Sequence, residues 1–200
     1  MRLIFDTETA GLPIKGAPPG DPRQPHLVQL AALLTEDDGT ERAAINLIIR
    51  PQGWTIPAEV AAIHGITTEI AERCGVTLNL AMLTFESLYR RADTLVAHNI
   101  GFDWLILLTA RKRAGWPPMR REDALPQFCT MAASTPHCRL PPTERMVAAG
   151  MSGFKAPKLI EAYRHFFGED FQGQHDASAD VRACARVYLH LQQIKERAAA

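Results

Sequence analysis

Four acidic residues occupy positions where a sheet and its helices would bring them together. Asp6 and Glu8 follow a short apolar run, residues 3–5, that predicts a buried strand. Because side chains alternate along a strand with a period of two, both carboxylates point to the same side. Asp103 and Asp180 each lie in the first turn of a predicted helix. The pattern predicts either one carboxylate cluster or four ordinary solvated and helix-capping acids.

A carboxylate cluster of this kind would need divalent cations, because the like charges repel one another. Ligand sets made only of oxygen favour Mg²⁺ or Mn²⁺ over Zn²⁺. Two such ions ~3.5 to 4 Å apart can activate a water molecule and stabilise the leaving oxygen of a phosphodiester. His175, on the loop that enters the helix of Asp180, is then the candidate general base. Its alternative interpretation is an ordinary surface histidine.

The elements that must position these residues follow from the apolar pattern. We expect strands at 3–5, 26–35, 43–49 and 94–97, with a weaker one at 127–131. We expect helices at 58–63, 67–73, 78–91, 102–113, 158–167 and 178–195, whereas 136–157 is too rich in Pro and Gly to assign. This order predicts a mixed sheet covered by helices, in one α/β domain over residues 1–200.

Two of these helices carry apolar residues at helical spacing, which predicts the faces that they bury. In the helix at 78–91 the spacing includes Leu80, Leu83, Phe85 and Leu88. In the last helix the predicted apolar face consists of Val181, Cys184, Ala185, Tyr188 and Leu191.

The composition fits an ordinary globular chain, with 46% hydrophobic and 22% charged residues in a length of 200. The 22 basic and 22 acidic residues cancel, so the net charge indicates no particular partner. Apolar runs fall far short of the ~20 residues of a membrane span, and the N-terminus does not resemble a signal peptide, so we expect a cytoplasmic protein without membrane contact. The four cysteines form no Cys-x-x-Cys pair, and we expect reduced thiols.

Three segments resemble the exonuclease motifs of the DEDD superfamily, in its branch with a histidine in the third motif. They are Phe5-Asp6-Thr7-Glu8-Thr9, then His98-Asn99 with Phe102-Asp103, then His175-Asp176-Ala177 with Asp180. The segment Ile63-His64-Gly65-Ile66-Thr67 is similar in many members, and the resemblance covers the chain to about Tyr188. This is the family of bacterial polymerase proofreading subunits and related 3′-to-5′ exonucleases. Three motifs in the right order are far more specific than any one of them.

The resemblance implies a ribonuclease-H-like fold, with a mixed five-stranded sheet flanked by helices. It also implies hydrolysis at the 3′ end of a nucleic acid, with release of nucleoside 5′-monophosphates. Asp6 would bridge two Mg²⁺ or Mn²⁺ ions, Glu8 and Asp180 would complete their shells, and Asp103 would act on the second ion through water. His175 would deprotonate the attacking water.

The resemblance further implies residues that handle the substrate. The backbone around Thr7, Thr9 and Gly11 would hold the terminal nucleotide, and His98 and Asn99 would support the site. The chain departs from the family's commonest first motif at Ala10, where many members have threonine, and in the long loop at 13–25. Both departures concern substrate handling and leave the predicted metal ligands intact.

The expected partner is a nucleic acid with a 3′ end, single-stranded DNA in particular. A basic rim for its phosphates would draw on Arg111, Lys112, Arg113, Arg120, Arg121, Lys155 and Lys158, although a solvated helix end explains the first three equally well. Candidates for stacking on a base are Phe102, Phe154, Trp54 and Trp116, although packing is the commoner role of such residues. Neither a polymerase-binding tail nor a clamp-binding motif is evident, so we expect a stand-alone nuclease.

Three alternatives stay open at this point. RNA or short oligoribonucleotides could be the substrate, because no identified residue reads the 2′-hydroxyl. A binding module without catalysis is less favoured, because all five motif residues are intact. A phosphatase that uses Asp6 as nucleophile is the last, but the phosphatase superfamily concerned has Asp where this chain has Glu8.

Overall fold

The computed structural model, which describes residues 1–199, is built around a five-stranded sheet in the order β3-β2-β1-β4-β5. Its strands are β1 (Arg2–Thr9), β2 (Leu27–Thr35), β3 (Glu41–Ile48), β4 (Thr94–Ala97) and β5 (Gln127–Cys129). β1, β2 and β3 pair antiparallel, whereas β4 and β5 run parallel to β1. Every residue of β2 is buried, which is the pattern of a strand covered on both faces.

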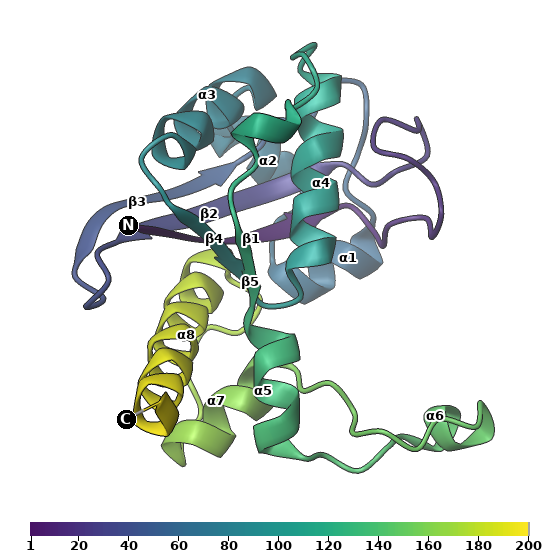
Figure 1. Cartoon of the computed structure of the whole chain (residues 1–200). Helices are drawn as coiled ribbons and strands as arrows, with labels where there is room; N and C mark the ends of the chain where they lie inside the picture. Colours follow the sequence, from purple (N-terminus) through teal and green to yellow (C-terminus); the bar gives the residue numbers. More distant parts are fainter. Residues whose placement is uncertain (200) are drawn as a thin grey trace.

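Eight α-helices and one short 3₁₀ turn complete the described part of the chain (Figure 1). The helices are α1 (Ala58–His64), α2 (Thr68–Cys74), α3 (Leu78–Tyr89), α4 (Ile100–Arg113), α5 (Thr130–Cys138), α6 (Glu144–Ala148), α7 (Leu159–Phe167) and α8 (Ala177–Ala199), and the turn is Arg121–Asp123. α2, α3 and α6 begin at threonine caps, whose hydroxyls accept a backbone N–H of the first turn. No helix in residues 1–199 is both long and apolar enough to cross a membrane.

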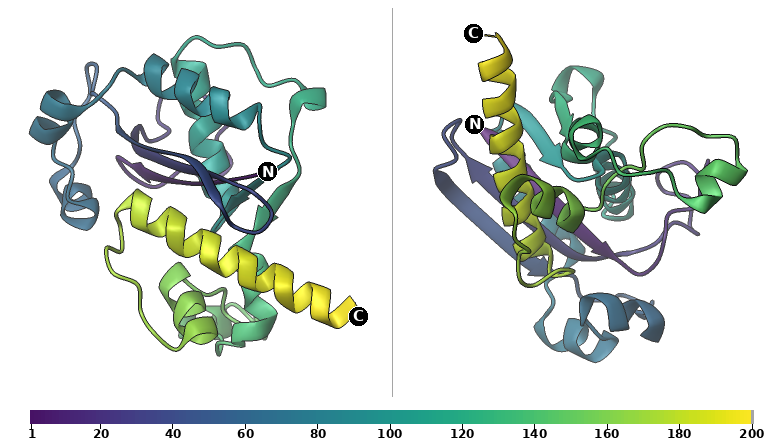
Figure 2. Two further views of the ribbon diagram at one scale, coloured as in Figure 1. Left: turned by 90° about the vertical axis from the view of Figure 1, so that its left-hand side faces the viewer. Right: turned by 90° about the horizontal axis from the view of Figure 1, so that it is seen from below.

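The helices cover the two faces of the sheet as separate layers (Figure 2, left). Leu3 and Phe5 of β1 pack with α3 and α4, and the rings of Phe5 and Phe85 meet edge to face at 5.6 Å between centroids. On the other face Ile4 packs with α8, through Val181 and its neighbours. α7 and α5 then pack on the outer side of α8. Alternate residues of β1 therefore belong to opposite layers, as the period of a strand requires.

The structure confirms most of the predicted elements and differs from the predictions at three places. The strand expected at 127–131 ends at Cys129, where α5 begins, and the unassigned stretch 136–157 contains the end of α5 and all of α6. In α3 the predicted apolar stripe is wrong in part, because Leu80 and Leu83 are exposed while Phe85 and Leu88 are buried. Ala81 and Met82 take core positions instead. In α8 all five predicted core residues are buried.

Residues 139–157 leave the layers as an extended arm, with α6 at its tip (Figures 1 and 2). The arm is closed at its base by a bridge between Leu140 and Lys155, whose backbone N–H donates to the Leu140 carbonyl at 3.0 Å. α6 buries none of its residues. The arm is therefore joined to the body only near its root.

Candidate active site

Asp6 and Glu8 lie on the face of β1 that α8 covers, because every second residue of a strand points to the same side and Ile4 packs against α8. The pKa of the Asp6 carboxyl is raised well above its usual range, first by burial and then by repulsion from Asp103, Asp180 and Glu8. Burial and repulsion from Asp180 and Asp103 also raise the pKa of Glu8, to about 8. The acids predicted from distant segments therefore meet in one cluster.

Asp103 is brought to β1 by the first turn of α4 and is only 3% exposed. Its Oδ1 accepts hydrogen bonds from the backbone N–H of Thr7 at 3.1 Å and from the Thr7 hydroxyl at 2.7 Å. Burial raises the pKa of Asp103 to about 7, although the hydrogen bonds from Thr7 lower it. Thr7 thus orients one oxygen of Asp103 and leaves the other available to the cluster.

Asp180 and His175 come from the start of α8 and the loop before it. The backbone N–H of His175 donates to Asp180 Oδ2 at 3.1 Å, which ties the loop to the helix. His175 has a φ of 64°, a left-handed conformation that is uncommon for residues other than glycine. Its side chain is exposed, and one ligand atom from each of Glu8, His175 and Asp180 lies within 4.8 Å of the other two.

The electrostatics of the cluster fit a divalent cation. Asp6, Glu8, Asp103 and Asp180 form no ion pair with any basic residue of the described chain, and the pKa of Asp180 is raised to about 6, mainly by burial. A buried carboxylate without a cation is costly, and it retains its proton or binds a metal instead. The donor set of four carboxylates beside one histidine matches the ligands of Mg²⁺ or Mn²⁺.

A cleft of about 440 Å³ opens over the cluster. Its walls include Asp6, His175 and Asp180 from the cluster, Asn99 from the start of α4, and Lys158 from the start of α7. Asn99 is exposed, has a φ of 72° and makes no capping hydrogen bond with its side chain. The side chain of Asn99 therefore lines the cleft without capping α4.

His98 lines the same cleft but is held by two internal hydrogen bonds. Its Nε2 lies 3.0 Å from the carbonyl oxygen of Pro157, and its Nδ1 lies 3.0 Å from the hydroxyl of Thr130. A carbonyl only accepts, so Nε2 carries the proton and Nδ1 accepts from Thr130. Burial lowers the pKa of His98, which keeps the ring neutral. His98 thus joins β4, α5 and the root of the arm.

The structure gives the other predicted substrate residues different surroundings. Both donors of Thr7 are used by Asp103, and the hydroxyl of the buried Thr9 donates to the carbonyl of Gly11 at 2.6 Å. The site prediction did not include Leu12. Leu12 directly follows the predicted substrate residue Gly11, and its large apolar side chain is 84% exposed. It also left out His64, whose pKa is lowered by burial and by the charge of the nearby His175. Only the similarity of residues 63–67 to family members pointed to His64.

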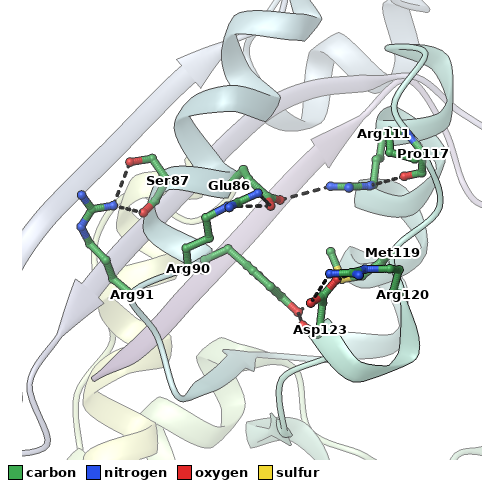
Figure 3. A network of polar contacts seen from close by, with 10 residues as sticks. Glu86, Ser87, Arg90, Arg91, Arg111, Pro117, Met119, Arg120 and Asp123 are labelled. Carbon is green, nitrogen blue, oxygen red and sulfur yellow. Dashed lines mark hydrogen bonds and ion pairs between the residues drawn. The ribbon is translucent and has the colours of Figure 1, made fainter.

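Several residues of the predicted basic rim pair with other residues of the same chain. Glu86 pairs with Arg90 and Arg111, and Arg111 also donates to the Pro117 carbonyl at 2.8 Å (Figure 3). Arg120 pairs with Asp123 in the same network.

Two further members of the rim have internal partners, since Arg113 donates to carbonyls of the 22–25 loop and Lys155 pairs with Glu161. The side chain of Arg121 lies outside the described part of the structure. Of the rim residues whose side chains are described, Lys158 lines the cleft, whereas Arg111, Lys112, Arg113, Arg120 and Lys155 do not.

The candidate aromatic residues also have separate surroundings. Trp54 stacks on His26 at 4.4 Å between ring centroids. Trp116 donates to Asn79 at 2.7 Å, and Phe102 packs against the core. Phe154, on the arm, is exposed.

Comparison with known proteins agrees with this architecture. The family model RNase_T, described as Exonuclease, matches residues 3–188. The fold is similar to that of E. coli exonuclease I bound to single-stranded DNA and a zinc ion (TM-score 0.74, 17% identity, 98% of this chain and 41% of that chain). It is also similar to E. coli exonuclease I in complex with a dT13 oligonucleotide (TM-score 0.75, 18% identity, 98% of this chain and 42% of that chain). This chain thus spans about two fifths of those chains, and at such identities the likeness shows the shared fold. The comparison with curated proteins finds no match.

Proposed function

The chain belongs to the RNase_T exonuclease family, within the DEDD superfamily, and from that premise we propose that it removes nucleotides from the 3′ end of single-stranded DNA. The products would be nucleoside 5′-monophosphates. The observation that carries the proposal is the cluster of four carboxylates, each with a raised pKa, beside the exposed His175. The proposal treats residues 1–200 as one exonuclease domain.

Family membership implies dependence on divalent metal, and the donor set supports Mg²⁺ or Mn²⁺. We assign Asp6, Glu8 and Asp180 to hold two ions and Asp103 to support them through water. When bound, such ions supply Lewis-acid activation of water and stabilisation of the leaving oxygen. The hydrogen bonds from Thr7 support a water-mediated role for Asp103, because they already occupy one of its oxygens.

His175 would act as the general base. The imidazole would take a proton from the water that attacks the last phosphorus as the bond from phosphorus to the 3′ oxygen of the preceding nucleotide breaks. That oxygen would take a proton from solvent and become the 3′-hydroxyl of the shortened strand, and the 5′-monophosphate would be released. The hydrogen bond from the His175 backbone to Asp180 supports this role, because it holds the loop against the cluster. Thr9, Gly11 and Asn99 would contact the terminal nucleotide, and His98 would position the cleft wall.

The test incubates 5′-labelled single-stranded DNA and its RNA counterpart with the protein and either Mg²⁺ or Mn²⁺. We expect a stepwise ladder that shortens from the 3′ end, is absent in EDTA, and is about 10²- to 10⁴-fold slower for His175→Ala. His165→Ala is the matched control, since His165 is an exposed histidine on α7. A ladder on RNA alone would move the substrate to RNA, and intact strands in every reaction would contradict the proposal.

A further inference from the structure

The arm, residues 139–157, exposes large apolar side chains that the rest of the fold does not cover. Val147 is 61% exposed, Met151 55% and Phe154 49%. None of the three belongs to a core cluster among residues 1–199, and α6 buries no residue. Apolar side chains gathered on a projecting segment indicate a surface that another molecule covers.

The root of the arm is part of the candidate active site. Ala156 and Pro157 line the same cleft as Asp6 and Asp180. Pro157 is held there by His98, through the hydrogen bond of 3.0 Å to its carbonyl. From this root the arm extends away from the layers of the sheet (Figure 1). A long molecule with one end in the cleft would therefore contact the arm where the rest of the molecule extends out of the cleft.

The charge of the arm favours a polyanion. Residues 139–157 contain three basic residues, Arg139, Arg145 and Lys155, against one acidic residue, Glu144, in a chain of zero net charge. Lys155 pairs with Glu161, whereas no carboxylate of residues 1–199 lies within ion-pair distance of Arg139 or Arg145. The arm thus carries a net positive charge, whereas the cluster in the cleft is acidic.

We propose that the arm is the binding surface for the single strand of nucleic acid that precedes the 3′-terminal nucleotide. The inference rests on the proposed function, because it places the 3′ end in the cleft. Phe154 and Met151 would contact unpaired bases, and Arg145 would contact a phosphate. Stacking on exposed aromatic residues combined with cations along the backbone is how single strands are held without reading their sequence.

The first test compares two double variants. Met151→Ala with Phe154→Ala removes the two apolar side chains that the proposal places against the bases and leaves Val147 unchanged. Leu80→Ala with Leu83→Ala is the matched control, because these leucines are 49% and 52% exposed on α3, which packs on the opposite face of the sheet from Asp6. The probe is a fluorescent twelve-nucleotide oligothymidylate in EDTA, and the readout is its anisotropy. Binding is thus measured without hydrolysis.

We expect the arm variant to bind the twelve-nucleotide probe about tenfold more weakly or worse, and the control variant to bind it like the parent protein. A dinucleotide lacks the length of strand that the proposal places on the arm, so for this probe we expect the affinity of the arm variant to change less than twofold. Equal affinity of the arm variant and the parent for the long probe would overturn the proposal. An equal loss for both probes would also overturn it, because the arm would then act on the cleft alone.

A second measurement tests the charge. Arg145→Ala is expected to lower the slope of log Kd against log salt by about 0.7, as for one lost phosphate contact on a single strand. An unchanged slope would contradict this contact. Both measurements are made in EDTA, so they remain valid if the ladder assay fails and the proposed hydrolysis is wrong.

Discussion

Asp6 and Phe5 are neighbours in β1, yet they have opposite surroundings. Phe5 packs edge to face on Phe85, whereas Asp6 faces α8 and three other carboxylates. The fold therefore places an acidic residue in the middle of β1, directly after the core residues Leu3, Ile4 and Phe5, where an apolar residue would pack without penalty. Such a local conflict with stability is expected at functional sites.

Replacing Asp6 by asparagine should separate activity from stability. The amide stays neutral at every pH, so where Asp6 is deprotonated the substitution removes repulsion within the cluster. At such an alkaline pH we expect the metal-free Asp6→Asn protein to unfold at a higher temperature than the parent, by about 2–4 °C for about 1 kcal/mol. Loss of a metal ligand should slow hydrolysis by about 10³-fold. Calorimetry and the ladder assay measure the two effects. Asp170→Asn, at an exposed pair with Arg164, is the control, and lower stability of Asp6→Asn at alkaline pH would contradict this account.

The junction between β4 and α4 contacts β1, α5 and the root of the arm. β4 ends at Ala97, Asn99 takes the left-handed conformation that turns the chain, and the first turn of α4 carries Asp103 to β1. His98, between them, binds both α5 and the root of the arm. The motif His98-Asn99 with Phe102-Asp103 thus spans the turn that connects β4 to α4, and this turn sets the spacing between its residues.

At this junction we expect His98→Ala to act on both stability and strand binding. Two partly buried hydrogen bonds are lost and the hydroxyl of Thr130 loses one partner, so the free energy of unfolding should fall by about 1–3 kcal/mol. Because the carbonyl of Pro157 is released, the affinity for the twelve-nucleotide probe should fall more than the affinity for a dinucleotide. Urea unfolding and anisotropy measure these effects. His98→Gln, which retains a donor, should recover part of both, and equal losses for the two probes would contradict a positioning role.

At the scale of the whole molecule, the acid cluster couples folding to pH and metal. The pKa values of Glu8, Asp103 and Asp180 are raised on folding, from ordinary values near 4 to about 8, 7 and 6. Between about pH 4 and pH 8 the folded protein therefore binds more protons than the unfolded chain. The stability that the cluster contributes is therefore full below pH 4 and is lost as the pH rises toward 8.

We accordingly expect Mn²⁺ to stabilise the protein more at pH 8 than at pH 6, because the ion binds the deprotonated carboxylates. In EDTA the contribution of the cluster to stability should fall over the same range. Other groups also titrate, since burial lowers the pKa of His26 to about 4. Urea unfolding of the parent and of Glu8→Gln at both pH values isolates the cluster. A larger effect of Mn²⁺ at pH 6 would contradict the assigned carboxylates.

Local patterns in the chain were enough to predict the sheet and most of its helices. The apolar run at 94–97 corresponds to β4. All five residues that the apolar spacing in 178–195 predicted for the core face of α8 are buried. In α3 the same kind of reasoning placed Leu80 and Leu83 in the core, where the structure has Ala81 and Met82. Spacing alone could not decide this, because the direction of a helix face depends on the layer against which it packs.

The sequence by itself determined the chemistry available to this protein, because residue types, their order and the alternation along β1 depend only on the chain. It thus indicated Asp6, Glu8, Asp103, Asp180 and His175. Only the tertiary structure decided which polar groups remain for a substrate. Thr7, Arg111 and Arg113 find internal partners far along the chain, whereas Phe154 finds none in the core. Such partnerships form between distant segments, so no local pattern records them.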